Sequence, residues 1–221
     1  MFHKAIELDP TYSDAYAELG NVQFVDMISQ WSHDPHGLDR AIQLEQQSIA
    51  LDNSNAFAYA IISQLYELTK RYDLSIAAAE RALAIDPNLA YGYASMALAL
   101  TSSGKPAEAV VAAHEAMRLD PHNRDSYSYY EGLAYIVMGS YEQAIPPVNR
   151  FLSRYSNIVG VRLMLIACYV ELGRNEEARA EAAEVKRANP QFSLAVQKRI
   201  SAFKQPLRDR FYADVAKAGL K

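Results

Sequence analysis

The amino-acid sequence predicts an all-α fold in which antiparallel helix pairs stack as a solenoid. Three observations predict it. A helix-stop phrase recurs about every 34 residues, and a series of small residues recurs at the same step. The apolar residues are chiefly Ala and Tyr, with 15 tyrosines, rather than the Val and Ile runs typical of sheets, and this composition favours helix.

The stop phrase joins an apolar residue to Asp or Asn and then, in most copies, to Pro. Proline cannot continue a helix and biases the preceding residue away from helical geometry, so each phrase predicts the end of a helix. Asn53, Pro87 and Pro121 are each 34 residues apart, a degenerate copy at 154–156 lies 35 further on, and Pro190 follows 34 later. The phrases are Leu8-Asp9-Pro10, Leu51-Asp52-Asn53, Ile85-Asp86-Pro87, Leu119-Asp120-Pro121 and Ala188-Asn189-Pro190.

Small residues form a second series with the same step. Its members are separated by 34, 34, 35 and 34 residues. Seven residues after each member comes a second residue, which lies on the same face of the helix. We expect two helices to cross closely where small residues recur. The first series is Ala41, Ser75, Ala109, Ala144 and Ala178, and the second is Ser48, Ala82, Ala116, Phe151 and Val185.

The first half of each unit carries a large residue, two spacers, an apolar residue and a small residue. This pattern is Tyr16 with Leu19-Gly20, Tyr59 with Ile62-Ser63, and Tyr93 with Met96-Ala97, and it is less regular in Ser128 with Glu131-Gly132 and in Arg162 with Leu165-Ile166. Turns then join the paired helices at Arg71-Tyr72, Gly104-Lys105-Pro106, Gly139-Ser140-Tyr141 and Gly173-Arg174-Asn175. Glycine suits a left-handed helix end, and proline suits a first helical turn.

In these features the chain resembles tetratricopeptide-repeat (TPR) proteins, whose pattern has a bulky aromatic, Leu-Gly, Tyr, a small residue and a closing proline at this period. The resemblance implies a right-handed superhelical solenoid of antiparallel helix pairs with a C-terminal capping helix. The predicted single array over 1–221 comprises a half-repeat helix at 1–10, repeats at 13–52, 56–86, 90–120, 124–155 and 159–189, a half-repeat at 193–203 and a capping helix at 206–218.

The first repeat is about nine residues longer than the others, and the excess lies near 29–37. An insertion between paired helices becomes a projecting loop. Its Trp31 is a candidate partner anchor because interfaces favour Trp, and the alternative is that it folds back over the helix ends. His33 and His36 flank Asp34, but no helix presents them and no cysteine lies nearby, so we expect no metal site.

The two ends of the chain are predicted to differ. Residues 2–10 look like the second helix of a repeat whose first helix is absent, so we expect the natural protein to continue N-terminally. At the other end, Leu207, Phe211, Val215 and Leu220 space out an amphipathic capping helix.

A narrower resemblance comes from the insertion at 31–41 and the ending at 211–220, which are similar to the C-terminal TPR region of certain bacterial class III adenylate cyclases and related regulators. In those proteins a cyclase or DNA-binding domain precedes the repeats. The resemblance implies part of a larger bacterial signalling protein. The sequence has none of the cyclase's metal-binding or nucleotide-binding motifs, so no catalytic residue is carried over and no cofactor is expected.

Composition narrows the function classes. With a formal charge of −4, the chain lacks the general excess of basic residues that nucleic-acid binding needs. Residues 186–221 hold nine basic and two acidic residues, and we predict that these basic side chains form a solvated face. The single Cys168 leaves no internal disulfide and fits a reducing compartment. No stretch has the about 18 uninterrupted apolar residues of a membrane span, and no signal-peptide pattern begins the chain. We predict a cytoplasmic protein with no membrane or nucleic-acid partner.

In TPR arrays the first helix of each repeat lines the concave face, so the resemblance implies a ligand groove there. The predicted groove residues are Asn21, Phe57, Gln64, Glu67, Tyr91, Leu98, Tyr129, Leu133 and Glu171. Such aromatic and amide side chains suit an extended or helical peptide, and the alternative is that some of them pack the seam between repeats. TPR domains that clamp a chaperone's C-terminal carboxylate use Lys, Asn and Arg, of which only Asn21 matches, so that ligand is not expected.

We therefore predict a protein-protein interaction or regulatory scaffold that binds a protein or peptide ligand in this groove. The alternative is self-association as a homodimer through exposed solenoid ends. We expect no enzymatic activity, because the sequence has no Gly-rich phosphate loop, no HExxH motif and no nucleophile in a recognisable turn.

Overall fold

The computed structural model describes residues 1–28, 34, 36–200 and 205–221, and every regular element in these ranges is a helix. This confirms the predicted all-α fold class. The chain divides into two compact units, Met1–Ser103 and Gly104–Lys221. The boundary falls inside the predicted repeat 90–120, and one continuous array through both units stays a prediction.

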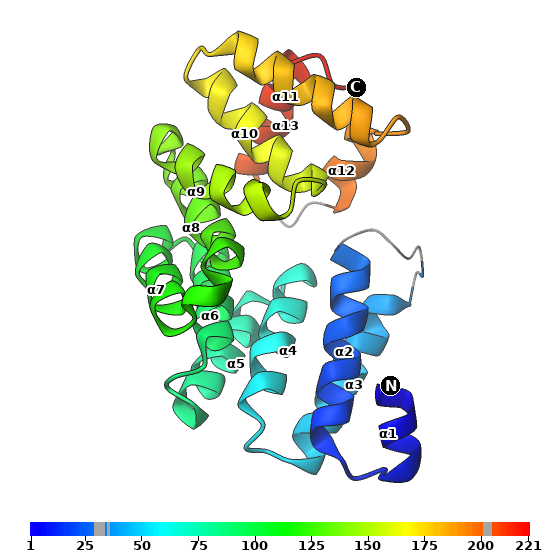
Figure 1. Cartoon of the computed structure of the whole chain (residues 1–221). Coiled ribbons are helices and arrows are strands. Elements are labelled where there is room, and N and C mark those ends of the chain that lie inside the picture. Colours follow the sequence, from blue (N-terminus) through cyan, green and yellow to red (C-terminus); the bar gives the residue numbers. More distant parts are fainter. Residues whose placement is uncertain (29–33, 35, 201–204) are drawn as a thin grey trace. The chain divides into compact units, whose positions relative to one another are not determined.

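Within its described residues, the first unit consists of one short helix, two helix pairs and a final single helix (Figure 1). The second helix of each pair packs along the first: α3 against α2, and α5 against α4, while α6 packs against both α4 and α5. The helices are α1 Phe2–Leu8, α2 Ser13–Ile28, α3 Gly37–Leu51, α4 Ala56–Leu68, α5 Tyr72–Ile85 and α6 Ala90–Ser102.

The second unit begins with a single helix, continues with two pairs and ends with two shorter helices. Here α7 packs on α8, α8 pairs with α9, α10 pairs with α11, and α13 covers part of α10. Phe211, Val215 and Leu220 are buried there, as in a capping helix. The helices are α7 Pro106–Leu119, α8 Arg124–Met138, α9 Tyr141–Arg154, α10 Val159–Glu171, α11 Asn175–Ala188, α12 Leu194–Ile200 and α13 Leu207–Lys217, with a short 3₁₀ turn at Pro121–Asn123.

The aspartates of the stop phrase end their helices through a local hydrogen bond. Asp52 follows α3 in an extended conformation, and its Oδ1 accepts the Ser54 backbone N–H at 2.9 Å and the Ser54 hydroxyl at 2.6 Å. Asp9 does the same with Thr11, and in both cases the hydrogen bonds to the carboxylate lower the pKa of the aspartate. The aspartate is the residue that forms this turn. The phrase Leu51-Asp52-Asn53, which has Asn53 where most other copies have proline, therefore also ends a helix.

The turns between paired helices share one residue in the left-handed conformation. Gly104, Gly139 and Gly173 have φ values of 89°, 75° and 72°, and Lys70 stands at the equivalent step with φ 60°. Glycine adopts this conformation freely, whereas a residue with a Cβ atom loses about 1 kcal/mol or more there. The turn between α4 and α5 is therefore strained relative to the other three.

Paired helices approach most closely at the small residues. The first series, Ala41, Ser75, Ala109, Ala144 and Ala178, is at most 1% exposed. A Cβ atom added to Gly132 on α8 would lie 2.6 Å from Cγ2 of Val148 on α9, and one added to Gly20 on α2 would lie 2.2 Å from Oε1 of Glu45 on α3. Both distances are shorter than normal packing allows, so a larger residue at either point would displace the side chain opposite. The exception in the second small series is Phe151, which is half-buried.

Replacing Gly132 by Ala should lower the free energy of unfolding by about 1–3 kcal/mol, because the new methyl group overlaps the stiff, branched side chain of Val148. The matched control is Gly160→Ala on α10, where an added Cβ meets nothing within 4 Å. The control should be neutral or stabilising, by up to about 1 kcal/mol. Urea unfolding followed by circular dichroism measures both, and equal effects of the two changes would contradict the close crossing.

Candidate functional site

Six of the predicted groove residues lie in the first unit, on α2, α4 and α6. These are the first helices of their pairs, and α4 packs against both α2 and α6. The predicted residues from these helices therefore lie along neighbouring elements of one unit.

An aromatic pair joins α4 to α6 near the beginning of both helices. The ring centroids of Phe57 and Tyr91 are 5.4 Å apart, with the ring planes tilted by 51°. Both rings are half-buried and pack against the core cluster that contains Phe24, Ile61 and Leu65. The inner edges of the two rings are thus fixed, while part of each ring still faces solvent.

Polar side chains continue this contact toward the other end of α4 and α6. The Gln64 amide donates to the Ser95 hydroxyl at 3.0 Å, and Ser95 donates in turn to the Ala60 carbonyl at 2.8 Å. The Ser102 hydroxyl donates to Oε1 of Glu67 at 2.7 Å. Gln64 and Glu67 are almost fully buried. Their polar groups therefore hold the two helices together and offer a ligand little surface.

The exposed part of this face is contributed by other residues. Asn21 on α2 and Leu98 on α6 are both half-buried. Val22 and Val25, which are not among the predicted groove residues, are 49% and 37% exposed on α2 beside Asn21. The signal that could have found Val25 is its spacing of four residues from Asn21, which places both on one side of the helix.

In the second unit, Tyr129 and Leu133 lie on α8. The Tyr129 ring is 5.7 Å from the Phe151 ring of α9 and 5.2 Å from its neighbour Tyr130, and it is half-buried. Leu133 is a core residue with 5% exposure. Of these two predicted groove residues, Tyr129 is the one that presents surface.

Glu171, at the end of α10, is engaged by the capping helix. Its carboxylate accepts two hydrogen bonds from the Arg210 guanidinium of α13, at 2.7 and 2.5 Å, and this pairing lowers the pKa of Glu171. The guanidinium also lies 5.7 Å from the Tyr141 ring centroid. A bidentate pair of this kind is directional, so Glu171 orients α13 on α10.

The predicted loop anchor Trp31 and His33 lie outside the described residues, and the Trp31 assignment stays a prediction. Asp34 accepts the His36 backbone N–H at 2.9 Å and pairs with Arg40 of α3. Its carboxylate is thus engaged near the beginning of α3. Among the described residues, no three His, Cys, Asp or Glu side chains are grouped as metal ligands would be.

Cys168 on α10 is fully buried, and burial raises the pKa of its thiol to about 12. The thiol is therefore protonated at neutral pH and packs as a small apolar group. In the part of the chain that the structure describes, no helix has the length and apolar character needed to cross a membrane.

A buried carboxyl lies behind the groove face of α2. Glu45 of α3 has no exposed surface, faces Gly20, and finds no hydrogen-bond partner for either oxygen among the described residues. Burial, with a smaller contribution from Glu18, raises the pKa of Glu45 to about 10. Glu45 is therefore protonated at neutral pH. The equivalent positions in the other pairs are the apolar residues Ala79, Ala113, Val148 and Ala182.

This arrangement of paired helices with close small-residue crossings defines the class of α-solenoid repeat proteins. Residues 58–89, which cover most of α4 and α5, match the tetratricopeptide-repeat family model. This stretch is therefore a tetratricopeptide repeat, as the sequence pattern predicted. No curated protein matches the sequence.

Solved TPR structures share the fold. TTC0263 from Thermus thermophilus, a thermophilic TPR protein, aligns with a TM-score of 0.67 and 17% identity, over 92% of this chain and 99% of that one. PilW, a type IV pilus biogenesis factor, aligns with a TM-score of 0.66 and 17% identity, over 94% and 93% of the two chains. YrrB, a TPR protein with an unusual peptide-binding site, aligns with a TM-score of 0.53 and 18% identity, over 90% and 97%. At these identities the likeness concerns the fold.

Replacing Glu45 by Gln should raise the free energy of unfolding by about 3 kcal/mol at pH 7 and by much less near pH 4. The folded chain keeps the Glu45 proton up to a pKa of about 10, whereas the unfolded chain releases it near 4.5. Wild-type stability therefore falls through this window as pH rises, by up to about 1.4 kcal/mol per pH unit, and the variant lacks this loss.

The measurement is urea unfolding of the wild type, Glu45→Gln and Glu45→Met between pH 4 and pH 9. Both variants should show the same reduced pH dependence, because both remove the ionisable group while keeping similar volume. Parallel pH profiles for wild type and variants would show that Glu45 ionises freely in the folded chain.

Proposed function

We propose that this protein is an interaction scaffold that binds a segment of another protein along α4 and α6 of the first unit, with α2 as one border. The observation that carries the proposal is the Phe57–Tyr91 pair, which is fixed on its inner edge and open on its outer edge. Rigid, half-exposed aromatic rings give a large contact area at a small loss of conformational entropy.

The chemistry of this face supports a peptide-like ligand. Leu98 adds apolar surface on α6, the helix that carries Tyr91, and Asn21 offers an amide that can pair with peptide backbone. Gln64 and Glu67 are engaged in the contact between α4 and α6, so they stabilise the shape of the face. The peptide-binding site of YrrB, a protein of the same fold, lends the proposal further support.

The wider context of the scaffold is also part of the proposal. The resemblance of residues 31–41 and 211–220 to a region of bacterial cyclases favours a regulatory role inside a larger signalling protein of the cytoplasm. In that role Trp31 would serve as an additional anchor, and Tyr129 would offer a separate contact on the second unit.

Replacing Tyr91 and Leu98 by Ala together should weaken capture of the partner at least about tenfold, because truncation of central apolar contacts typically costs more than about 1.4 kcal/mol. The measurement is affinity capture from lysate of the source organism, quantified by mass spectrometry against the wild-type bait. The control replaces Val111 and Met138, two exposed residues of the second unit, by Ala.

The control should capture the same protein as the wild type. If both double variants are folded by circular dichroism and capture equal amounts of the partner, the assignment of the groove to α4 and α6 is wrong.

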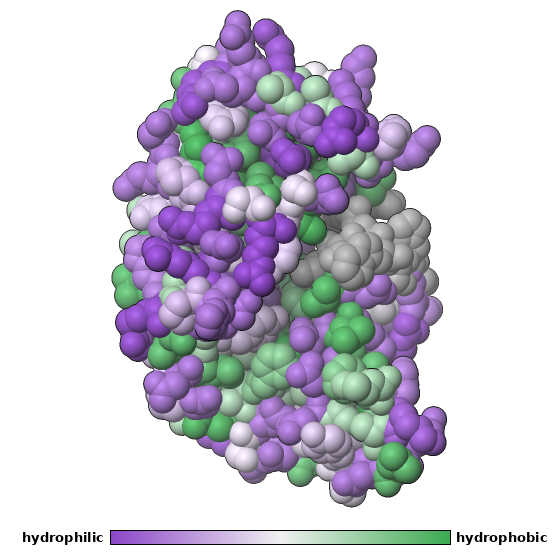
Figure 2. Space-filling view, in the orientation of Figure 1, coloured by the Kyte–Doolittle hydropathy of each residue, from purple (hydrophilic) through white to green (hydrophobic). Residues whose placement is uncertain are grey.

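A second candidate function is self-association, and exposed apolar side chains on α1 and α2 favour it. Figure 2 shows apolar surface gathered over these two helices. Leu8 of α1 and Val22 and Val25 of α2 are exposed, as is Tyr12 between the two helices. A dimer that covers this surface would remove apolar area from water, and this removal would favour association.

If α2 is the dimer surface, light scattering should give twice the monomer mass at high concentration. The double variant Val22→Lys and Val25→Lys should then be monomeric, because two charges would be buried without partners. A monomer at every concentration of the wild type excludes this candidate and leaves the scaffold proposal unaffected.

A further inference from the structure

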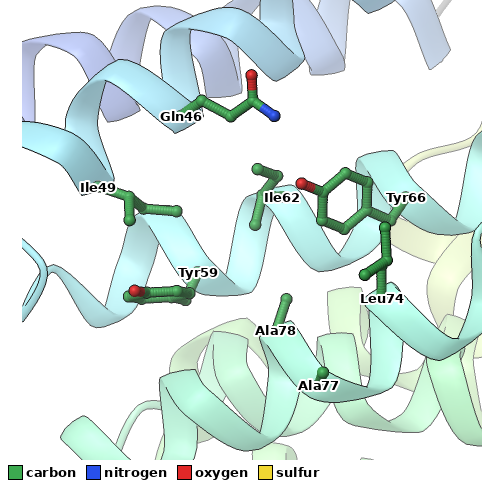
Figure 3. Close-up of a pocket in the computed structure, with 8 residues that line it drawn as sticks. All are labelled: Gln46, Ile49, Tyr59, Ile62, Tyr66, Leu74, Ala77 and Ala78. Carbon is green, nitrogen blue, oxygen red and sulfur yellow. The ribbon is translucent and has the colours of Figure 1, made fainter.

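An apolar hollow of about 340 Å³ opens on the first unit between α3, α4 and α5. Figure 3 shows Tyr59, Ile62 and Tyr66 of α4 lying between Ile49 of α3 and Leu74 of α5. Leu74 is 50% exposed, so the hollow leaves a large apolar side chain in contact with water. An unfilled apolar surface with this shape gains free energy when an apolar side chain covers it.

The hollow is separate from the groove proposed above. Tyr59 follows Phe57 by two residues, and Tyr66 follows Gln64 by two residues. Two residues turn about 200° around an α-helix, so the hollow and the groove occupy opposite faces of α4. A ligand in one does not compete for the side chains of the other.

Two arginines flank the hollow, one near each end. The guanidinium of Arg71 lies 5.8 Å from the Tyr66 ring centroid, and that of Arg81 lies 5.8 Å from the Tyr59 ring centroid. Arg81 follows Leu74 by seven residues on α5, which places both on the same side of the helix. Ten residues separate the two arginines, or about 15 Å along the helix.

These two arginines are positively charged residues in a unit that is otherwise strongly acidic. Residues 1–103 contain five Lys or Arg against thirteen Asp or Glu, yet two of the five cations border this hollow. Both arginines are exposed, and neither has an ion-pair partner among the residues that the structure describes. Other arginines, such as Arg174 and Arg210, are paired with glutamates. Arg81 donates one long hydrogen bond, 3.5 Å, to the Asn53 carbonyl, and neither guanidinium is neutralised by a carboxylate among the described residues.

We propose that this hollow docks an acidic, apolar segment of a partner protein, in which Asp or Glu residues at both ends flank one or two bulky apolar side chains. The apolar side chains fill the space over Ile62 and Leu74, and the carboxylates pair with Arg71 and Arg81. A helical segment matches the spacing when its acidic residues are about three turns, or ~16 Å, apart. The apolar floor and the acidic composition of the unit disfavour a nucleic acid, whose phosphates need an extended basic surface.

The test uses a fluorescein-labelled helical peptide with paired glutamates about three turns apart and leucines between them. Fluorescence polarisation with the full chain should show saturable binding. A peptide with lysines in place of the glutamates, and one with serines in place of the leucines, should each bind at least tenfold more weakly.

The double variant Arg71→Glu and Arg81→Glu should also bind the acidic peptide at least tenfold more weakly. Its matched control is Arg124→Glu with Arg179→Glu, which makes the same charge change at exposed arginines of the second unit and should bind like the wild type. A second variant, Ala77→Trp, fills the hollow from an exposed position of α5 without changing charge, and it should block binding.

Three outcomes would overturn the proposal: equal binding of the lysine peptide, unchanged affinity of both hollow variants, or displacement of the peptide by a single-stranded oligonucleotide at matched charge. The groove variant with Tyr91 and Leu98 replaced by Ala should bind the peptide like the wild type. Loss of partner capture by that variant and loss of peptide binding by the hollow variants are thus independent results.

Discussion

The close approach of the two helices within each pair is the constraint on which the rest of the molecule depends. Where α8 and α9 cross, Gly132 leaves room for Val148, and where α4 and α5 cross, the Ser63 hydroxyl donates to the Ser75 carbonyl at 2.8 Å. Only small side chains permit such distances, and the distances in turn fix how far apart the first helices of successive pairs stand. The exposed faces of α4 and α6 are consequences of that spacing.

The sequence was sufficient to predict the fold class, because the signals that end and pair helices are local and repeat along the chain. An aspartate such as Asp52 closes its own turn with Ser54, two residues away, so the information lies within the phrase itself. Lys70 and Glu45 depart from the repeated pattern, at a turn and at a core position. The period identifies such positions, but the strain at Lys70 and the protonation of Glu45 follow from backbone conformation and burial.

The candidate site was predicted less completely. The helical period shows which residues share one face of a helix, but it does not show which residues of other helices contact that face. Gln64 and Glu67 lie on the predicted face, but Ser95 and Ser102, which are 31 and 35 residues later, engage them. Glu171 is likewise held by Arg210, 39 residues further along the chain. The hollow was not predicted at all, because its lining comes from three helices whose mutual positions only the folded structure provides.

The left-handed conformation of Lys70 affects the local unfolding of the first unit. In a solenoid each helix pair is stabilised mainly by its neighbours, so local strain is not shared over the whole chain. The strained turn at Lys70 lies in the pair α4–α5, and the Glu45 carboxyl, which has no hydrogen-bond partner among the described residues, lies in the adjoining pair α2–α3. Both should lower the free energy of partial unfolding in the same region, so we expect amide hydrogens of these helices to exchange with solvent through sub-global openings. The segment that carries both proposed binding faces is then also expected to open as one cooperative unit, and a ligand on either face should slow amide exchange across both pairs.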